Sequence, residues 1–283
     1  MKLTVQADAA FKICQITDIH LGTFPLKEED KRTLAGIDQV LTANEFDLIM
    51  VTGDLIWGKI NEAPKESLAE LFKVLNRSGV PVALTYGNHD AEGAFSRSDL
   101  RNYENMLANP ATKENPFVIN DRENYTLDIY QDEGVRNRIF VWDSGDYFNS
   151  AIKEGYATLE PEQVIWFNKH AAERATTVTD LAFMHIPLAE YYLAADNIIE
   201  GTKGEKICSG WYSSGLFYAF INQQNVKALF VGHDHENNYR SQIDGIELSY
   251  GNVAGYNTYG ELARGVRIID LYSDHYDTQV INF

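Results

Sequence analysis

The sequence predicts an α/β fold in a single domain that spans residues 1–283. Three observations lead to this prediction. Short apolar runs alternate with helix-type patterns through the first half, several apolar runs end in Asp, Asn or His, and short runs separated by turn signals fill the last part of the chain. Hydrophobic residues make up 45% of the chain, which is enough for a sizeable core, and we find no repeat or linker that divides it.

The first half of the chain follows a strand–helix order. The runs FKICQITD (11–18), DLIMVTGD (47–54) and VPVALTYGNHD (80–90) each predict a strand. Apolar residues at helical spacing lie between them: Leu34, Ile37, Val40 and Leu41 in the first segment, and Leu68, Leu71, Phe72 and Leu75 in the second. Pro64 and Gly79 fit the start and the end of the second helix. This alternation predicts a parallel sheet with right-handed crossovers.

The second half is mixed. Residues 125–145 predict a hairpin around D-E-G that leads into a core strand, and residues 161–175 predict a helix. The segments 181–187 and 226–235 predict two further buried strands. From about residue 239 the pattern changes to short strands with D-G and S-D turns, for which we expect a second, largely antiparallel sheet.

Five of the predicted strands end in side chains that can bind a metal ion. In chain order these are Asp18 and His20; Asp54; Asn88, His89 and Asp90; His185; and His233 with His235. In an open α/β sheet, ligands bind outside the carboxyl ends of the strands. Oxygen and imidazole donors without thiolate suit Mn, Fe or Zn, with Mg as a further candidate, and the donors are numerous enough for two divalent ions.

The formal net charge of −17 argues against a broad electropositive face for nucleic acid or for an anionic membrane. Two divalent ions reverse this sign locally, because their charge of +4 outweighs two ligand carboxylates and a bridging hydroxide. A small phosphorylated substrate is therefore attracted there. The chain has no apolar window long enough to cross a membrane and no layout typical of a signal peptide, so we expect a cytoplasmic protein. The oligomeric state stays open.

The motifs as a set resemble a known family. D-x-H (18–20), GD (53–54), GNHD (87–90), MH (184–185) and GHDH (232–235), in this order, resemble the calcineurin-like metallophosphoesterases. The segments HIPLAEYY and LSYGNVAGYNTYGELARGVRIIDL are more closely similar to purple-acid-phosphatase-like intracellular phosphoesterases of plants and fungi. The resemblance implies a four-layer α/β/β/α sandwich of two mixed β-sheets flanked by helices. It places a dinuclear metal site at the C-terminal strand edge.

The resemblance also implies a role for each motif residue. It assigns Asp18, His20 and His235 to one ion, Asn88, His185 and His233 to the other, and Asp54 to both. By the same resemblance, His89 faces the substrate, Asp90 orients the ring of His89, and Asn88 helps to hold the phosphoryl oxygens. The chain departs from the purple enzymes at Trp57, where they have an iron-binding tyrosine, because an indole has no ligating lone pair. We therefore expect no obligatory ferric iron.

The expected function is a metal-dependent phosphoric ester hydrolase, a phosphomonoesterase in which a metal-bridging hydroxide attacks phosphorus in line. Two alternatives stay open. One is a phosphodiesterase or nucleotide-directed hydrolase of the same family. The other is a catalytically silent metal-binding scaffold that recruits partners through residues 187–225. Tyr191, Tyr192, Tyr250 and Tyr256 follow the motifs, and in a chain with 16 tyrosines we assign most of them to packing.

Overall fold

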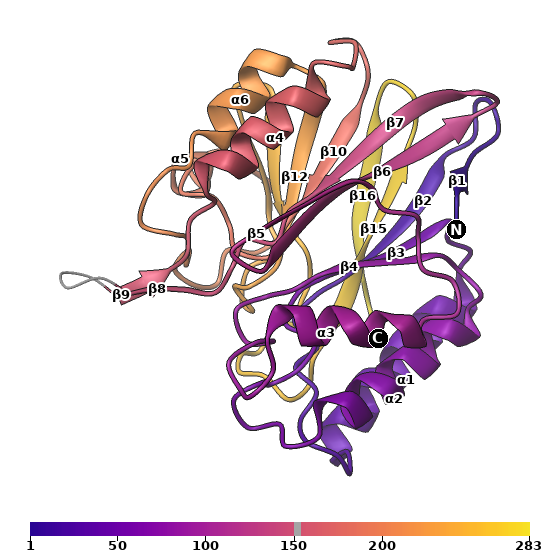
Figure 1. Cartoon of the computed structure of the whole chain (residues 1–283), viewed down its shortest axis with the longest axis vertical. Coiled ribbons are helices and arrows are strands. Elements are labelled where there is room, and N and C mark those ends of the chain that lie inside the picture. The colour runs from indigo at the N-terminus through magenta and orange to yellow at the C-terminus, as the bar shows by residue number, and fades with distance from the viewer. Residues whose placement is uncertain (150–153) are drawn as a thin grey trace.

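The computed structural model describes residues 1–149 and 154–283, and two β-sheets face each other in it (Figure 1). In the described chain, the first sheet has five strands, of which β2, β3 and β4 are parallel and β15 is antiparallel to β2. Its order is β16 (Tyr276–Asn282), β15 (Gly265–Leu271), β2 (Phe11–Ile16), β3 (Leu48–Thr52) and β4 (Val82–Thr85).

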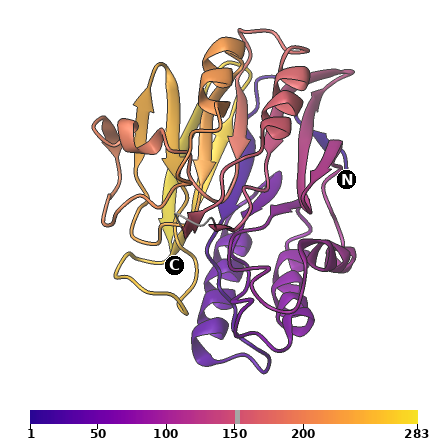
Figure 2. The same ribbon diagram turned by 60° about the vertical axis from the view of Figure 1, so that its left-hand side comes forward.

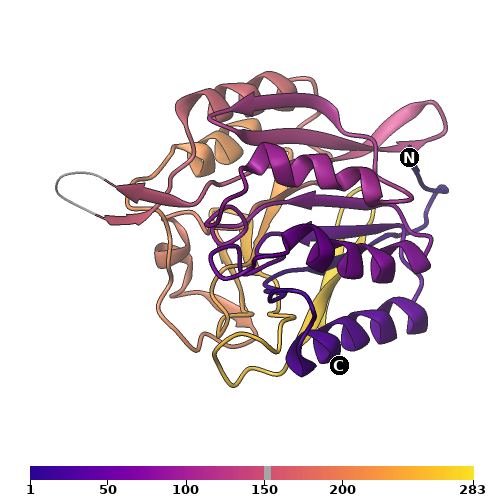
Figure 3. The ribbon, with the colours of Figure 1, turned by 60° about the horizontal axis from the view of Figure 1, so that its bottom comes forward.

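The second sheet has nine strands within the described residues, and β7, β10, β12 and β14 are parallel neighbours at its centre. Its order is β1 (Leu3–Thr4), β6 (Arg122–Gln131), β7 (Gly134–Val141), β10 (Asp180–Phe183), β12 (Val226–Val231), β14 (Ile246–Tyr250), β13 (Arg240–Ile243) and β11 (Ile198–Glu200), while β5 (Glu114–Ile119) also pairs with β6. A separate hairpin, β8 (Tyr147–Asn149) and β9 (Glu154–Tyr156), projects from the body (Figure 3).

Helices cover the outer faces of both sheets (Figures 1 and 2). The apolar stripes of α1 (Glu28–Ala43) and α2 (Pro64–Arg77) pack on the five-stranded sheet, and α4 (Pro161–Ala171) and α6 (Leu216–Gln223) pack on the other. Shorter helices are α3 (Arg97–Tyr103), η1 (Glu104–Met106) and α5 (Tyr191–Ala194). The four-layer α/β/β/α sandwich is confirmed. In the described part of the chain, no helix combines the length and apolar character that a membrane span requires.

The side chains of each strand divide between two cores with a period of two residues. On β2, Phe11 and Ile13 face the other sheet, whereas Cys14 and Ile16 face the helices. The same alternation holds on β12, where Phe230 packs between the sheets. Strands buried on both faces read as continuous apolar runs, which is why their sequences show no alternation of polar and apolar residues.

The expectation of a separate antiparallel sheet after residue 239 is wrong. Strands β13 and β14 complete the nine-stranded sheet, with β14 parallel to β12, while β15 and β16 extend the five-stranded sheet. The physical reason lies in burial. All residues of Ile246–Tyr250 are buried, so this strand belongs at a sheet centre, whereas Tyr276–Asn282 alternates between more and less exposed positions, as an edge strand does. The parallel strands β2, β3 and β4 therefore belong to one sheet, and the parallel strands β7, β10, β12 and β14 belong to the other.

Polar side chains join the two sheets. Gln15 on β2 donates from Nε2 to the carbonyl of Val231 at the end of β12, at 3.2 Å. Arg267 on β15 is 2% exposed and donates from Nε to the Tyr250 carbonyl (2.6 Å) and from Nη2 to the Asn238 carbonyl (2.7 Å). These bonds fix the sheets relative to each other next to the segments that follow β12 and β14.

Replacing Arg267 with Ala tests this link. The substitution removes the side-chain donor from the buried Tyr250 carbonyl and from the partly buried Asn238 carbonyl, and it opens a cavity. We therefore expect the free energy of unfolding to fall by about 2–4 kcal/mol, measured by urea denaturation. The matched control is Arg77→Ala on α2, where the side chain is 61% exposed and pairs with Asp38, and where we expect a change of about 0.5 kcal/mol or less. Equal effects of the two substitutions would contradict the role of Arg267.

Candidate metal centre

The structure brings the ends of four strands, two from each sheet, together at one edge of the sandwich. Asp18 and His20 follow β2, Asp54 follows β3, His185 follows β10, and His233 and His235 follow β12. These side chains form two buried groups in which the potential ligand atoms lie within 4.8 Å of one another: Asp18, His20 and His235 in the first group, and Asp54, His185 and His233 in the second. The first group holds the three side chains assigned to one ion, and the second holds Asp54 with two of the three assigned to the other. The third, Asn88, lies in the loop after β4.

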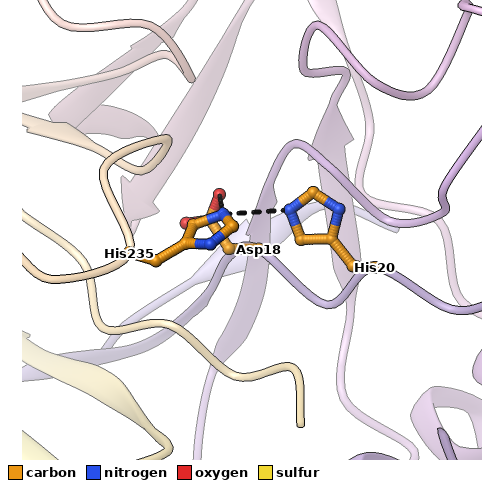
Figure 4. Close-up of side chains that lie close together, drawn as sticks. All are labelled: Asp18, His20 and His235. Atoms are coloured by element: carbon orange, nitrogen blue, oxygen red, sulfur yellow. Dashed lines mark hydrogen bonds and ion pairs between the residues drawn. The ribbon is translucent and has the colours of Figure 1, made fainter. Parts of the chain in front are cut away.

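Figure 4 shows the first group, in which the rings of His20 and His235 point toward each other beside Asp18. The Nε2 atoms of the two histidines are 3.1 Å apart, and Nε2 of His235 lies 3.6 Å from Oδ1 of Asp18. The three residues come from the two sheets, since β2 and β12 belong to different ones. A divalent ion between these atoms can be reached by one carboxylate and two imidazoles.

Asp54, a member of the second group, also contacts the first. Its Oδ2 atom is 3.1 Å from Nε2 of His185 and 3.4 Å from Nε2 of His20. Its Oδ1 atom accepts a hydrogen bond of 2.9 Å from the backbone N–H of His89. One carboxylate oxygen therefore faces both groups, which is the position that a shared ligand requires.

Buried atoms without hydrogen-bond partners test whether the residues fit metal ions. Such atoms are rare in native proteins and call for an explanation. Of the 17 such atoms in the described residues, seven belong to the predicted ligands: Nδ1 of His20, Oδ2 of Asp54, Oδ1 of Asn88, Nε2 of His185, both ring nitrogens of His233 and Nδ1 of His235. Cations would satisfy the atoms of Asp54, Asn88 and His185 and one ring nitrogen of His233, whereas His20 and His235 face the centre through Nε2 and keep Nδ1 free. The oxygen and imidazole donors suit divalent transition metals. The residues therefore fit a dinuclear metal site.

The backbone is strained where it carries these ligands. Asp18, His20, Asp54 and His233 have positive φ angles of 54°, 49°, 52° and 79°, a region that residues with a side chain seldom adopt. Each such residue costs about 1–3 kcal/mol and persists only where the surroundings enforce it. Asp18 provides part of this enforcement, because its carboxylate oxygens accept from the backbone N–H of His233 at 3.1 Å.

Two glycines permit the close approach of the loops. A Cβ atom on Gly53, whose φ is +91°, would lie 2.5 Å from Nδ1 of His185. A Cβ atom on Gly87 would lie 2.1 Å from Oδ1 of Asp54. The glycines of the GD and GNHD motifs are therefore required by the packing of ligand against backbone.

Burial keeps most of the imidazoles neutral. It lowers the pKa of His20 and of His233 well below the usual value, and that of His235 to about 3. Neutral imidazoles offer the lone pairs that a metal needs. Burial also raises the pKa of Asp18 to about 7, because the carboxylate is held away from water.

His185 and Asp54 behave differently because they face each other. Burial lowers the pKa of His185, but the negative charge of Asp54 outweighs it and raises the pKa to about 9. Burial raises the pKa of Asp54, but the positive charge of His185 outweighs it and holds the pKa well below the usual value. In the absence of ions a proton on His185 is the counter-charge of Asp54, and a bound cation would replace it.

Asp90 does not orient the ring of His89, so this expectation is wrong. Its buried carboxylate instead accepts four backbone hydrogen bonds of 2.7 to 3.1 Å. The donors are the N–H groups of Asp54, Leu55, Ile56 and Gly87. The physical reason is that these N–H groups, in the loops after β3 and β4, have no strand partner. Asp90 therefore holds together the loops that carry Asp54 and His89.

The residue that faces the His89 ring is Glu92, which the sequence reasoning missed. Nδ1 of His89 lies 2.7 Å from Oε2 of Glu92. The hydroxyl of Tyr147 donates to Oε1 of Glu92 at 2.6 Å and accepts from Nδ2 of Asn88 at 3.1 Å. The sequence signal for Glu92 was a carboxylate two residues after GNHD, whereas Tyr147 carries no local signal at all.

Aromatic rings enclose the centre. Trp57 lies with its ring centroid 4.1 Å from that of His20 and 4.5 Å from that of His89, so it acts as a wall. Tyr156 stands against His233 and Tyr259 stacks on His235. Of the tyrosines that follow the motifs, Tyr191 and Tyr250 are fully buried in the core, as expected for packing residues. Tyr192 is exposed and lines a pocket together with Tyr156.

Comparisons with known proteins agree with this geometry. The family model for calcineurin-like phosphoesterase matches residues 11–237. The chain is 30% identical over 295 residues to the "probable inactive purple acid phosphatase 29" of Arabidopsis thaliana. The aligned region covers 92% of this chain and 76% of that protein. It is 28% identical over 279 residues to phosphatase DCR2 of Saccharomyces cerevisiae, covering 86% of this chain and 48% of that one.

Among solved structures, a dimetal phosphatase from Danio rerio superposes with a TM-score of 0.67 at 15% identity and covers 97% of both chains. At that identity the likeness establishes the fold alone. The family model, in contrast, spans most of the sequence and includes all five motifs. This chain belongs to the calcineurin-like phosphoesterase family.

Proposed function

We propose that this chain is an active metal-dependent phosphomonoesterase that hydrolyses small phosphorylated substrates with two divalent metal ions. The observation that carries the proposal is the pair of buried ligand groups that Asp54 joins, together with the unpartnered buried atoms of Asp54, Asn88, His185 and His233. Mn, Fe and Zn suit these donors best, and Mg is a further candidate. We also propose a cytoplasmic location, which stays a prediction.

In this proposal, seven residues hold the ions. Asp18, His20 and His235 bind one, Asn88, His185 and His233 bind the other, and Asp54 contacts both. When bound, the ions supply Lewis acidity and activate water for in-line attack on phosphorus. Asn88 presents its amide oxygen to the centre, since its Oδ1 atom is buried and unpartnered, and it also helps to position the phosphoryl group.

His89 is the residue suited to assist the leaving group. Its side chain is 23% exposed, whereas the six carboxylate and imidazole ligands are nearly or fully buried. Nδ1 is engaged by Glu92, which leaves Nε2 for the substrate. In the imidazolium form both ring nitrogens carry a proton, so Nε2 can give its proton to the departing oxygen while Nδ1 stays bonded to Glu92. Asp90 supports the reaction indirectly, because it holds the loop after β4 against the loop after β3.

The name of the plant relative describes that protein as probably inactive, so activity is the point to test. This chain keeps every ligand-type residue of both groups as well as His89. A silent scaffold has no need of a partly exposed histidine held by a carboxylate beside the ions. The absence of metal-dependent phosphate release from a panel of esters would favour the scaffold, and a preference for bis(p-nitrophenyl) phosphate would favour a diesterase.

Replacement of Asp54 with Ala removes the shared ligand. We expect metal content, measured by elemental analysis, to fall below one ion per chain, and hydrolysis of p-nitrophenyl phosphate to drop by at least about 1,000-fold. The control is Asp38→Ala on α1, an exposed aspartate 40% accessible to solvent, which should keep both metal content and activity. Full occupancy and full activity in the Asp54 variant would contradict the shared-ligand assignment.

Replacement of His89 with Ala should separate metal binding from turnover. The variant keeps both groups of ligands, so we expect unchanged metal content, but kcat lower by about 100- to 10,000-fold because the proton donor is lost. His275→Ala, at a side chain 56% exposed, serves as the matched control with normal kcat. If the His89 variant keeps the kcat of the unmodified enzyme, His89 does not protonate the leaving group.

A further inference from the structure

A chain of hydrogen bonds beside the metal centre links Asn88 to His89 through two residues that are not metal ligands. Asn88 Nδ2 donates to the Tyr147 hydroxyl at 3.1 Å, the hydroxyl donates to Glu92 Oε1 at 2.6 Å, and Glu92 Oε2 faces His89 Nδ1 at 2.7 Å. Tyr147 comes from the β8–β9 hairpin, which projects from the sandwich (Figure 3). A segment remote in sequence thus contacts two adjacent residues of the GNHD motif.

The chemistry of the groups fixes the direction of each bond. An ionised carboxylate only accepts, and a tyrosine hydroxyl has a single proton. Tyr147 gives this proton to Glu92, so toward Asn88 its oxygen can only accept. The NH2 group of Asn88 must then point at Tyr147, which turns its carbonyl oxygen the other way. That oxygen is the buried, unpartnered Oδ1 atom.

The same argument holds for His89. Because Glu92 only accepts, the proton of a neutral His89 ring resides on Nδ1, and the ring is held through that atom. A second proton, the one a leaving group can take, then sits on Nε2, on the side of the ring away from Glu92. Among the described residues, none forms a hydrogen bond with Nε2 of His89. The side chains of His89 and Glu92 are 23% and 15% exposed, so their contact is shielded from water more than a surface pair is.

Packing holds the hairpin residue in place. The rings of Tyr147 and Tyr156 stack with their centroids 5.8 Å apart, and Tyr156 in turn stands edge-on to the ring of His233 at 4.3 Å. The hydroxyl of Tyr147 is therefore positioned by contacts on both strands of the hairpin.

We propose that Glu92 and Tyr147 are positioning residues: Tyr147 sets the Asn88 amide with its oxygen toward the ion, and Glu92 sets the His89 ring with Nε2 toward the substrate. This inference rests on the proposed function. It also replaces the expected role of Asp90, whose carboxylate is occupied by backbone donors.

Replacing Glu92 with Ala tests whether Glu92 positions the ring of His89. We expect kcat for an alkyl phosphate to fall by about 10- to 100-fold with little change in KM, because the leaving alkoxide needs the proton. For p-nitrophenyl phosphate, whose leaving group is a weak base, the loss should be several times smaller. Glu92→Gln keeps an acceptor oxygen and should restore part of the rate. Equal losses of kcat for both esters, or no loss, would overturn the positioning of His89 by Glu92.

Replacing Tyr147 with Phe tests whether the Tyr147 hydroxyl orients the Asn88 amide, because the substitution keeps the ring and its stacking but removes the hydroxyl. We expect one of the two Mn ions to bind about 10-fold more weakly in a metal titration. Tyr218→Phe on α6, a tyrosine 67% exposed, is the matched control with unchanged affinity. Unaltered binding of both ions to the Tyr147 variant would overturn the role assigned to its hydroxyl.

A measurement on the metal-free protein separates this inference from the proposed function. Nitrogen-15 NMR of the histidine rings should show a proton on Nδ1 of His89 in the unmodified chain and in Tyr218→Phe, and should show this preference lost in Glu92→Ala. An unchanged His89 signal in Glu92→Ala contradicts the positioning role. A chain with the expected NMR signals that hydrolyses no ester contradicts only the proposed function.

Discussion

The structure depends on one electrostatic constraint: two carboxylates and four imidazoles are buried together at the edge where two sheets meet. Among the described residues, no Lys or Arg forms an ion pair with Asp18 or Asp54. Buried charges without partners are costly, and the shifted pKa values of Asp18, Asp54 and His185 reflect that cost. Divalent cations bound as we propose would remove this cost and would stabilise the fold as well as serve the chemistry.

The sandwich makes this arrangement possible because neither sheet holds all the ligands. Strands β2, β3 and β4 bring Asp18, His20, Asp54 and Asn88, whereas β10 and β12 bring His185, His233 and His235. The apolar layer between the sheets and the bonds of Gln15 and Arg267 set the distance across the centre. The candidate ligands lie on short loops directly after rigid strands. The strands therefore limit how far these side chains can move.

The sequence predicted the parts of the fold and site that depend on local pattern. Continuous apolar runs marked the buried strands, and polar residues at their ends marked the candidate site, because strands of both sheets end at the same edge of the sandwich whatever their separation in the chain. It failed where the outcome depended on remote partners. Nothing near residue 246 indicates that β14 pairs with β12, and the neighbour of a histidine in sequence, Asp90, proved less important to its ring than Glu92. Tyr147 reaches Asn88 across 59 residues, which no local pattern encodes.

The most direct test of the account is a crystal structure of the Mn-loaded protein with anomalous diffraction at the metal edge. The account predicts two anomalous peaks about 3.5–4 Å apart, with Asp54 between them. One peak should contact Asp18, His20 and His235, and the other Asn88, His185 and His233. No peak at this edge of the sandwich, or a single ion that leaves one group of ligands without contact, would contradict the dinuclear centre on which the proposed hydrolase depends.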